Sequence, residues 1–240
     1  MTRRDSAPLV VVVPGLGLTR YVSRLAAQVR RAGAACEVLD LPGYGSPGPR
    51  VTAPDVLSVG RVAAARVAHA AATVRPRRVV LLGHSTGAQA ALAAAVEVQQ
   101  SRDDVAVVLA GPTFAPAQRT LPGLLARVPL AYRHDAPWQL DPRELLRAGP
   151  RDLLALVRSG QQDRPEDRVA QLRLPLVLTA GRHDAFAPRT WLDELAGRAT
   201  SSPAVRVAVL GGSHNNPWTH AKDLACLALR GRPDRRQVGR

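Results

Sequence analysis

Residues 77–87 read Arg-Arg-Val-Val-Leu-Leu-Gly-His-Ser-Thr-Gly, and this stretch decides the fold. The apolar run 79–82 leads directly into Gly83-His84-Ser85-Thr86-Gly87, and an Ala-rich segment, 88–100, follows at once. This order predicts a strand, a sharp turn with one serine at its apex, and a helix. A nucleophile elbow needs this arrangement, because side chains at the flanking positions of so tight a turn would collide. The alternative interpretation is an ordinary Gly-rich turn between a strand and a helix.

Five further apolar runs are typical of buried strands, and they lie at residues 9–13, 36–41, 105–110, 176–180 and 205–210. Helices are expected between them, from Thr19 to about Arg31, from Asp55 to a point before Pro76, and over 191–196 and 217–229. Continuous apolar strands that alternate with helices indicate a parallel sheet covered on both faces.

Residues 112–172 have a different texture, with eight prolines between short amphipathic pieces. The segment is too long for a loop and predicts a small helical lid. We therefore expect an α/β fold with a mostly parallel, doubly wound sheet in a single domain of residues 1–240. The lid is expected as an insertion after the sixth strand at about 112–172, and a flexible tail at about 231–240.

The composition indicates a globular protein, with 46% hydrophobic and 22% charged residues. The formal net charge is +14, but Lys222 is the only lysine and the arginines are spread along the whole chain. A nucleic-acid site would gather its basic residues on one stripe or module, so we expect no specific nucleic-acid partner. Weak, salt-sensitive association with polyanions is compatible with the charge.

The two cysteines, Cys36 and Cys226, lie far apart and lack metal-ligand spacing, so we expect buried thiols in a reducing compartment. The apolar run 9–13 is too short for a signal peptide, and no segment approaches the length of a membrane span. A cytoplasmic protein without membrane attachment is the resulting expectation. The oligomeric state is left open.

A serine hydroxyl needs a base within hydrogen-bond reach, and the base needs an acid that orients it. In a parallel sheet such groups belong in the loops at the carboxyl ends of the strands. The strand at 176–180 leads into a loop that carries Asp184, and the strand at 205–210 leads into a Gly-rich loop that carries His214. We therefore expect Ser85, His214 and Asp184 as nucleophile, base and acid. Asp135 and Asp141 are more distant alternatives for the acid.

With this order of nucleophile, acid and histidine, the chain resembles the α/β-hydrolase fold family, in particular its serine esterases and lipases. The run Gly181-x-x-Asp184-x-x-x-Pro188 is similar to the acid loop of the family. Residues 40–46 are similar to its Asp-x-x-Gly-x-Gly-x-Ser loop, although the serine arrives one residue early. The resemblance covers most of the chain outside the lid and the tail.

The resemblance also implies an oxyanion hole made by the backbone N–H groups of Leu16 and Thr86. Pro14-Gly15 stands where the family usually has His-Gly, and Pro14 has no N–H to donate. A misplaced donor would raise the barrier by roughly 2.7–4 kcal/mol.

The resulting hypothesis is a serine hydrolase that cleaves a small to medium apolar carboxylic ester, a small-molecule substrate, through an acyl-enzyme. No metal or organic cofactor is expected. An acyltransferase, a thioesterase, a lactone or C–C bond hydrolase, or a non-catalytic ligand-binding protein would use the same residues, because a fold does not determine a function. Residues of the lid are candidates for the substrate pocket, and packing within the lid is the alternative role for each of them. They are Phe114 and Trp138 above all, with Leu121, Leu124, Leu125, Leu145 and Leu146.

Overall fold

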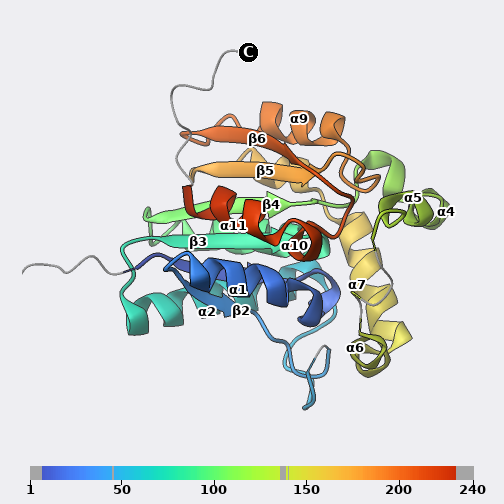
Figure 1. Ribbon diagram of the computed structural model, residues 1–240, viewed down its shortest axis with the longest axis horizontal. Helices are drawn as coiled ribbons and strands as arrows, with labels where there is room; N and C mark the ends of the chain where they lie inside the picture. Colours follow the sequence, from blue (N-terminus) through green and yellow to red (C-terminus); the bar gives the residue numbers. More distant parts are fainter. Residues whose placement is uncertain (1–6, 45, 136–138, 140, 231–240) are drawn as a thin grey trace, which may run out of the picture.

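Six apolar segments form one sheet of parallel strands, which confirms the expected α/β fold (Figure 1). The computed structural model describes residues 7–44, 46–135, 139 and 141–230. Along the chain the strands are β1 (Leu9–Val13), β2 (Ala35–Val38), β3 (Val79–His84), β4 (Val105–Ala110), β5 (Leu176–Gly181) and β6 (Val205–Leu210). Their order in the sheet is β2-β1-β3-β4-β5-β6, so all carboxyl ends lie at one edge.

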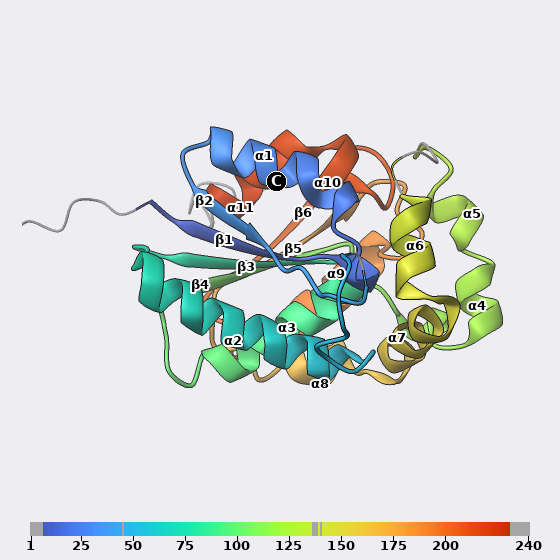
Figure 2. The same ribbon diagram turned by 90° about the horizontal axis from the view of Figure 1, so that it is seen from below.

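Helices cover both faces of the sheet (Figure 2). One face carries α1 (Ser23–Arg31), α10 (Asn216–Thr219) and α11 (Ala221–Arg230), and the other carries α2 (Val56–Val74), α3 (Thr86–Val98), α8 (Pro165–Val169) and α9 (Arg189–Arg198). Successive side chains of β1 alternate between the two layers, because strand residues point to opposite faces. Val11 and Val13 join the core under α2 and α3, whereas Val10 and Val12 join the core under α1 and α11.

Three of the expected elements end or begin elsewhere. Strand β2 ends at Val38, not at residue 41, because its partner β1 ends at Val13. The helix expected from Thr19 starts as a short 3-10 turn, η2 (Arg20–Val22), and Thr19 caps nothing with its side chain. The expected helix over 217–229 is divided into α10 and α11.

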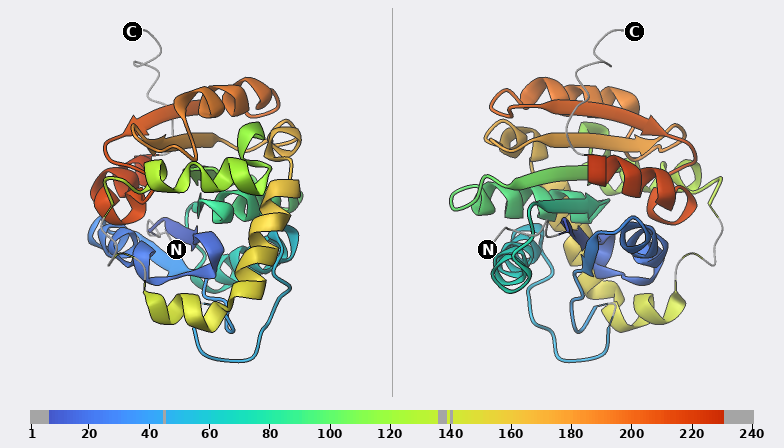
Figure 3. Two further views of the ribbon diagram at one scale, coloured as in Figure 1. Left: turned by 90° about the vertical axis from the view of Figure 1, so that its right-hand side faces the viewer. Right: turned by 60° about the vertical axis from the view of Figure 1, so that its left-hand side comes forward.

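The segment between β4 and β5 contains only helices among its described residues. They are η3 (Pro116–Gln118), α4 (Leu121–Leu125), α5 (Val128–Ala131), α6 (Pro142–Ala148), α7 (Pro150–Gln162) and α8. We call residues 112–172 the insertion. Helices α4 to α7 lie beside the carboxyl ends of the strands, as the left view of Figure 3 shows. The insertion follows β4, the fourth strand, and not the sixth as expected, because β5 and β6 come after it in the chain. The expected tail at 231–240 lies outside the described residues.

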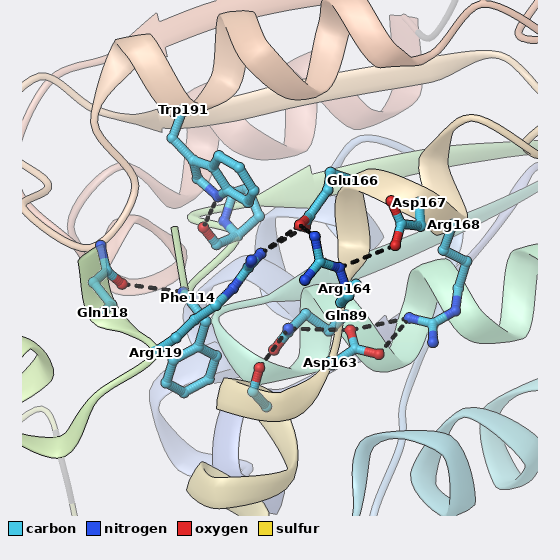
Figure 4. A network of polar contacts seen from close by, with 12 residues as sticks. Gln89, Phe114, Gln118, Arg119, Asp163, Arg164, Glu166, Asp167, Arg168 and Trp191 are labelled. Carbon is cyan, nitrogen blue, oxygen red and sulfur yellow. Dashed lines mark hydrogen bonds and ion pairs between the residues drawn. The ribbon is translucent and has the colours of Figure 1, made fainter. Parts of the chain in front are cut away.

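Buried ion pairs within the insertion fix its α8 end against the sheet layer (Figure 4). The guanidinium of Arg119 lies 2.6 Å from the buried Glu166 carboxylate, and Arg168 lies 2.7 Å from Asp163. Gln89 on α3 donates to Asp163 at 3.1 Å. Burial raises the pKa of Asp163, although Arg168 and Gln89 act in the opposite direction. Because a buried charge without a partner is strongly destabilising, these pairs hold the segments of the insertion together, and the bond from Gln89 ties it to α3.

Two further hydrogen bonds tie the start of the insertion to α9 and to the loop that follows β5. Trp191 on α9 donates its indole N–H to the carbonyl of Pro112 at 3.1 Å (Figure 4). Gln118 donates to the carbonyl of Phe186 at 2.6 Å. The insertion is therefore held at both its ends by the same side of the sheet. None of the helices in the described ranges combines the length and apolarity needed to cross a membrane.

Candidate active site

Ser85 occupies the turn between β3 and α3 with an unusual backbone conformation, φ 58° and ψ −129°. A positive φ is strained for a residue with a side chain, so the neighbours must hold it in place. The close packing there requires glycine on both sides. A Cβ atom on Gly83 would lie 2.3 Å from the carbonyl oxygen of Gly87, and one on Gly87 would lie 2.3 Å from that of Val13. The turn places Ser85 at the N-terminal end of α3, where the helix dipole is positive.

His214 and Asp184 come from the loops after β6 and β5, which are paired neighbours in the sheet. The Nδ1 atom of His214 lies 2.9 Å from Oδ2 of Asp184, and both side chains are buried. The other carboxylate oxygen of Asp184 accepts the N–H groups of Phe186 and Ala187 at 2.9 and 3.1 Å. Burial acts to raise the pKa of Asp184, but the attraction of His214 and these hydrogen bonds outweigh it and hold the pKa below its usual value.

An ionised Asp184 can only accept, so Nδ1 of His214 carries the proton and Nε2 is left as an acceptor. This Nε2 atom is buried and has no hydrogen-bond partner among the described residues. The imidazole is held by aromatic edges, with the ring centroids of Phe186 and Tyr132 at 4.9 and 5.6 Å. The arrangement leaves Nε2 of His214 as a basic nitrogen in a fixed position and without a hydrogen-bond partner among the described residues.

Ser85 and His214 line the same pocket, which has a volume of about 60 Å³. Its other lining residues are Gly15, Leu16, Leu18, Tyr21, His84, Tyr132, Leu145 and Asn215. Within the described residues no hydrogen bond joins the hydroxyl of Ser85 to Nε2 of His214. The structure thus brings the three expected side chains to one site, with the acid and the base bonded and the hydroxyl beside them.

Leu16 and Thr86, the expected oxyanion donors, also lie next to each other. The N–H of Leu16 donates to the side-chain oxygen of Thr86 at 2.8 Å, which sequence reasoning did not foresee. Thr86 is the first residue of α3, so its own N–H has no acceptor inside the helix. Leu16 can therefore bind an oxyanion only by sharing or leaving its bond to the Thr86 hydroxyl.

The alternative acids lie elsewhere. Asp135 accepts the N–H of Asn215 at 3.2 Å, beside His214 but not on its ring. Asp141 caps α6 and pairs with Arg20. Asp184 is thus the carboxylate that bonds the imidazole of His214 in the described part of the chain.

The residues expected to line the pocket lie in different places in the structure. Leu145 lines the pocket. Phe114 does not line it, because its ring is buried against Gly160 of α7. Leu125 and Leu146 are largely exposed. Trp138 lies outside the described residues.

Sequence reasoning missed Tyr21, His84 and Tyr132 as lining residues. His84 is in fact buried, and both of its ring nitrogens are hydrogen-bonded. A signal was available, because a histidine at the end of an apolar strand must find partners when it is buried. Over the described residues, no group of three or more His, Cys, Asp or Glu side chains could hold a metal ion.

The sequence profile described as "Alpha/beta hydrolase family" matches residues 10–225. Comparison with the curated proteins gave no match. Among solved structures, a lipase-esterase related protein from Clostridium acetobutylicum is similar with a TM-score of 0.71 at 15% identity, over 95% of this chain and 96% of the other. A monoacylglycerol lipase from Paleococcus ferrophilus has a TM-score of 0.62 at 20% identity, over 95% and 97%. The enol-lactonase from Burkholderia xenovorans has a TM-score of 0.66 at 17% identity, over 95% and 92%.

Proposed function

The chain belongs to the alpha/beta hydrolase family, and we propose that it is a serine hydrolase that cleaves small, apolar carboxylic esters through an acyl-enzyme. One observation carries the proposal. Nε2 of His214 is a buried basic nitrogen without a hydrogen-bond partner among the described residues, its ring is oriented by Asp184, and His214 lines the same pocket as Ser85. A buried, unpaired acceptor costs free energy, so its retention favours a role in proton transfer.

In the proposed mechanism, the hydroxyl of Ser85 attacks the ester carbonyl carbon while Nε2 of His214 takes its proton. Asp184 holds the imidazole in this tautomer and stabilises its positive charge. The absent bond between Ser85 and His214 is compatible with this step, because catalytic hydrogen bonds often tighten only in the complex with substrate.

The negative charge that develops on the carbonyl oxygen would be held by the N–H groups of Thr86 and Leu16. His214 then gives its proton to the leaving alkoxide, and the ester bond breaks. In the second half, His214 takes a proton from water, the hydroxide attacks the acyl-enzyme, and Ser85 is released with its hydroxyl restored.

The size of the pocket favours a short acyl group. Its volume of about 60 Å³ is well below the roughly 300–1,000 Å³ of pockets that bind drug-sized ligands. Leu16, Leu18 and Leu145 make most of the pocket wall apolar. We take the insertion as the lid of this site, because Tyr132 and Leu145 belong to it and line the pocket.

The test is a substrate series on the wild type, Ser85→Ala and the matched control Ser201→Ala, which removes an exposed hydroxyl far along the chain. We expect p-nitrophenyl acetate and butyrate to be cleaved faster than the octanoate, with an ethyl thioester and a lactone included to separate the related activities. Ser85→Ala should lower kcat by about 10⁴-fold or more, and a fluorophosphonate should label Ser85 in the wild type. Retention of most of the activity in Ser85→Ala would mean that another group is the nucleophile. A protein that binds esters but is neither labelled nor active would be a binding protein.

A further inference from the structure

A chain of three hydrogen bonds crosses the floor of the pocket. The N–H of Gly15 donates to the hydroxyl oxygen of Tyr21 at 2.6 Å, that oxygen lies 2.8 Å from Nδ1 of His84, and Nε2 of His84 lies 2.9 Å from the carbonyl oxygen of His214. All four residues are buried. The chain connects the loop after β1, the end of β3 and the loop after β6. Strands β1 and β3 are paired neighbours, whereas β4 and β5 separate β3 from β6 in the sheet, so the bond from His84 to His214 joins segments that no backbone pairing joins.

The two ends of the chain determine the position of every proton in it. The N–H of Gly15 can only donate, and the carbonyl of His214 can only accept. Nε2 of His84 must therefore carry a proton, so Nδ1 of a neutral ring is the acceptor and the hydroxyl of Tyr21 donates to it. Burial above all, together with the charge of His214, lowers the pKa of His84 to about 3, which keeps this imidazole neutral.

This arrangement also distinguishes the two neighbouring histidines, whose ring centroids are 4.8 Å apart. Both nitrogens of His84 are occupied, so it has no free site for the proton of Ser85. His214 has a free Nε2 and depends on its neighbours for orientation. The backbone N–H of His214 donates to the carbonyl of Ala131 at 3.0 Å, and its ring Nδ1 donates to the carboxylate of Asp184. Its backbone carbonyl accepts from Nε2 of His84.

We propose that Tyr21 and His84 are positioning residues, which hold the main chain of His214 and the Gly15–Leu16 peptide in register around Ser85. The proposal rests on the proposed function, because it concerns the base and an oxyanion donor of that reaction. One end of the chain fixes the base through its own carbonyl. The other end fixes Gly15, whose peptide precedes the amide of Leu16. A shift at either end moves both groups relative to the serine.

The test uses Tyr21→Phe, which keeps the buried ring and removes the hydroxyl that links Gly15 to His84. Misplacement of catalytic groups by about 1 Å costs roughly 100-fold in rate. We therefore expect kcat for a short p-nitrophenyl ester to fall by about that factor while KM changes little, with the same loss in the rate of fluorophosphonate labelling of Ser85. The matched control is Tyr44→Phe, which also removes a tyrosine hydroxyl, here with a single hydrogen bond to the carbonyl of Thr52 at 3.2 Å, on a residue that does not line the pocket.

A second pair of variants separates positioning from mere stability. The side chain of His84→Gln keeps one donor and one acceptor, whereas that of His84→Leu keeps neither. We therefore expect His84→Gln to retain more of the wild-type kcat than His84→Leu, with kcat expressed per Ser85 that the fluorophosphonate can label. Wild-type kcat in Tyr21→Phe, alongside normal labelling of Ser85 in the wild type, would overturn the positioning roles and leave the proposed function standing. If Ser85 of the wild type is not labelled, the proposed function fails and the positioning roles fail with it.

Discussion

Replacing Gly87 with alanine tests the close packing on which the serine turn depends. The added Cβ atom would lie 2.3 Å from the carbonyl oxygen of Val13 and 2.6 Å from that of Pro14, whereas ordinary contacts are 3.4–4 Å. Main-chain atoms would have to move by about 1 Å. Overpacking costs about 1–3 kcal/mol when side chains can yield, and main chain yields less. We therefore take the upper end, about 3 kcal/mol. After a gain of about 1 kcal/mol from helix propensity, we expect a net loss of about 2 kcal/mol in the free energy of unfolding.

The displaced residues are those that lead to Gly15 and Leu16, so activity should suffer as well. A shift of about 1 Å predicts a loss of roughly 100-fold in kcat. Urea unfolding followed by circular dichroism gives the change in free energy, and turnover of p-nitrophenyl acetate gives the change in rate.

Gly197→Ala is the matched control. Gly197 also lies within a helix, α9, and a Cβ atom there meets nothing within 4 Å. Helix propensity alone should then act, and we expect a stabilisation of up to about 1 kcal/mol with unchanged kcat. If Gly87→Ala unfolds at the same urea concentration as Gly197→Ala and keeps wild-type kcat, the argument from close packing is wrong.

Two further predictions concern the acid and the anchoring of the insertion. Asp184→Asn should lower kcat by about 10⁴-fold. Because the pKa of Asp184 is lowered in the folded state, the ionised group stabilises the fold above the ordinary pKa of about 3.9. The stability difference between wild type and Asp184→Asn should therefore shrink as the pH falls below that value, and a constant difference from pH 7 to pH 2 in urea titrations would contradict this. Glu144→Ala removes the buried carboxylate on α6 that accepts the N–H groups of Thr19 and Arg20 at 3.1 Å and the Thr19 hydroxyl at 2.9 Å. We expect the free energy of unfolding to fall by about 2 kcal/mol and amide hydrogen exchange in α6 to become faster. Unchanged exchange in α6 would show that Glu144 does not anchor the insertion.

Much of the fold followed from periodicity, because each buried parallel strand is a short, continuous apolar run. All six strands lie where these runs indicated, and α2 begins after Asp55, whose carboxylate caps it at 2.7 Å. Ends of elements were less predictable. Leu39 and Leu41 are apolar and buried, yet the strand ends before them since the neighbouring strand provides no further partner.

The candidate site also has features that the sequence predicted and features that it did not. Local sequence indicated the turn at Ser85, because Gly83 packs against the carbonyl oxygen of Gly87, only four positions away. The close approach of Gly87 to Val13 is a tertiary contact with another strand. Local sequence also indicated Asp184 and His214 by their places after two late strands. The bond between them depends on the pairing of β5 with β6, which places the two loops side by side at the carboxyl edge of the sheet.

Contacts between remote loops were decided by the tertiary structure alone. Nothing near Leu16 in the sequence indicates that its N–H meets the hydroxyl of Thr86, and nothing near Tyr21 indicates that it lies between Gly15 and His84. Hydrogen bonds of this kind join groups whose separation is set by the packing of whole strands and helices, to within a few tenths of an ångström. Periodicity and turn chemistry describe only neighbours along the chain, so they predict which residues reach the pocket edge and leave their partners across it undetermined.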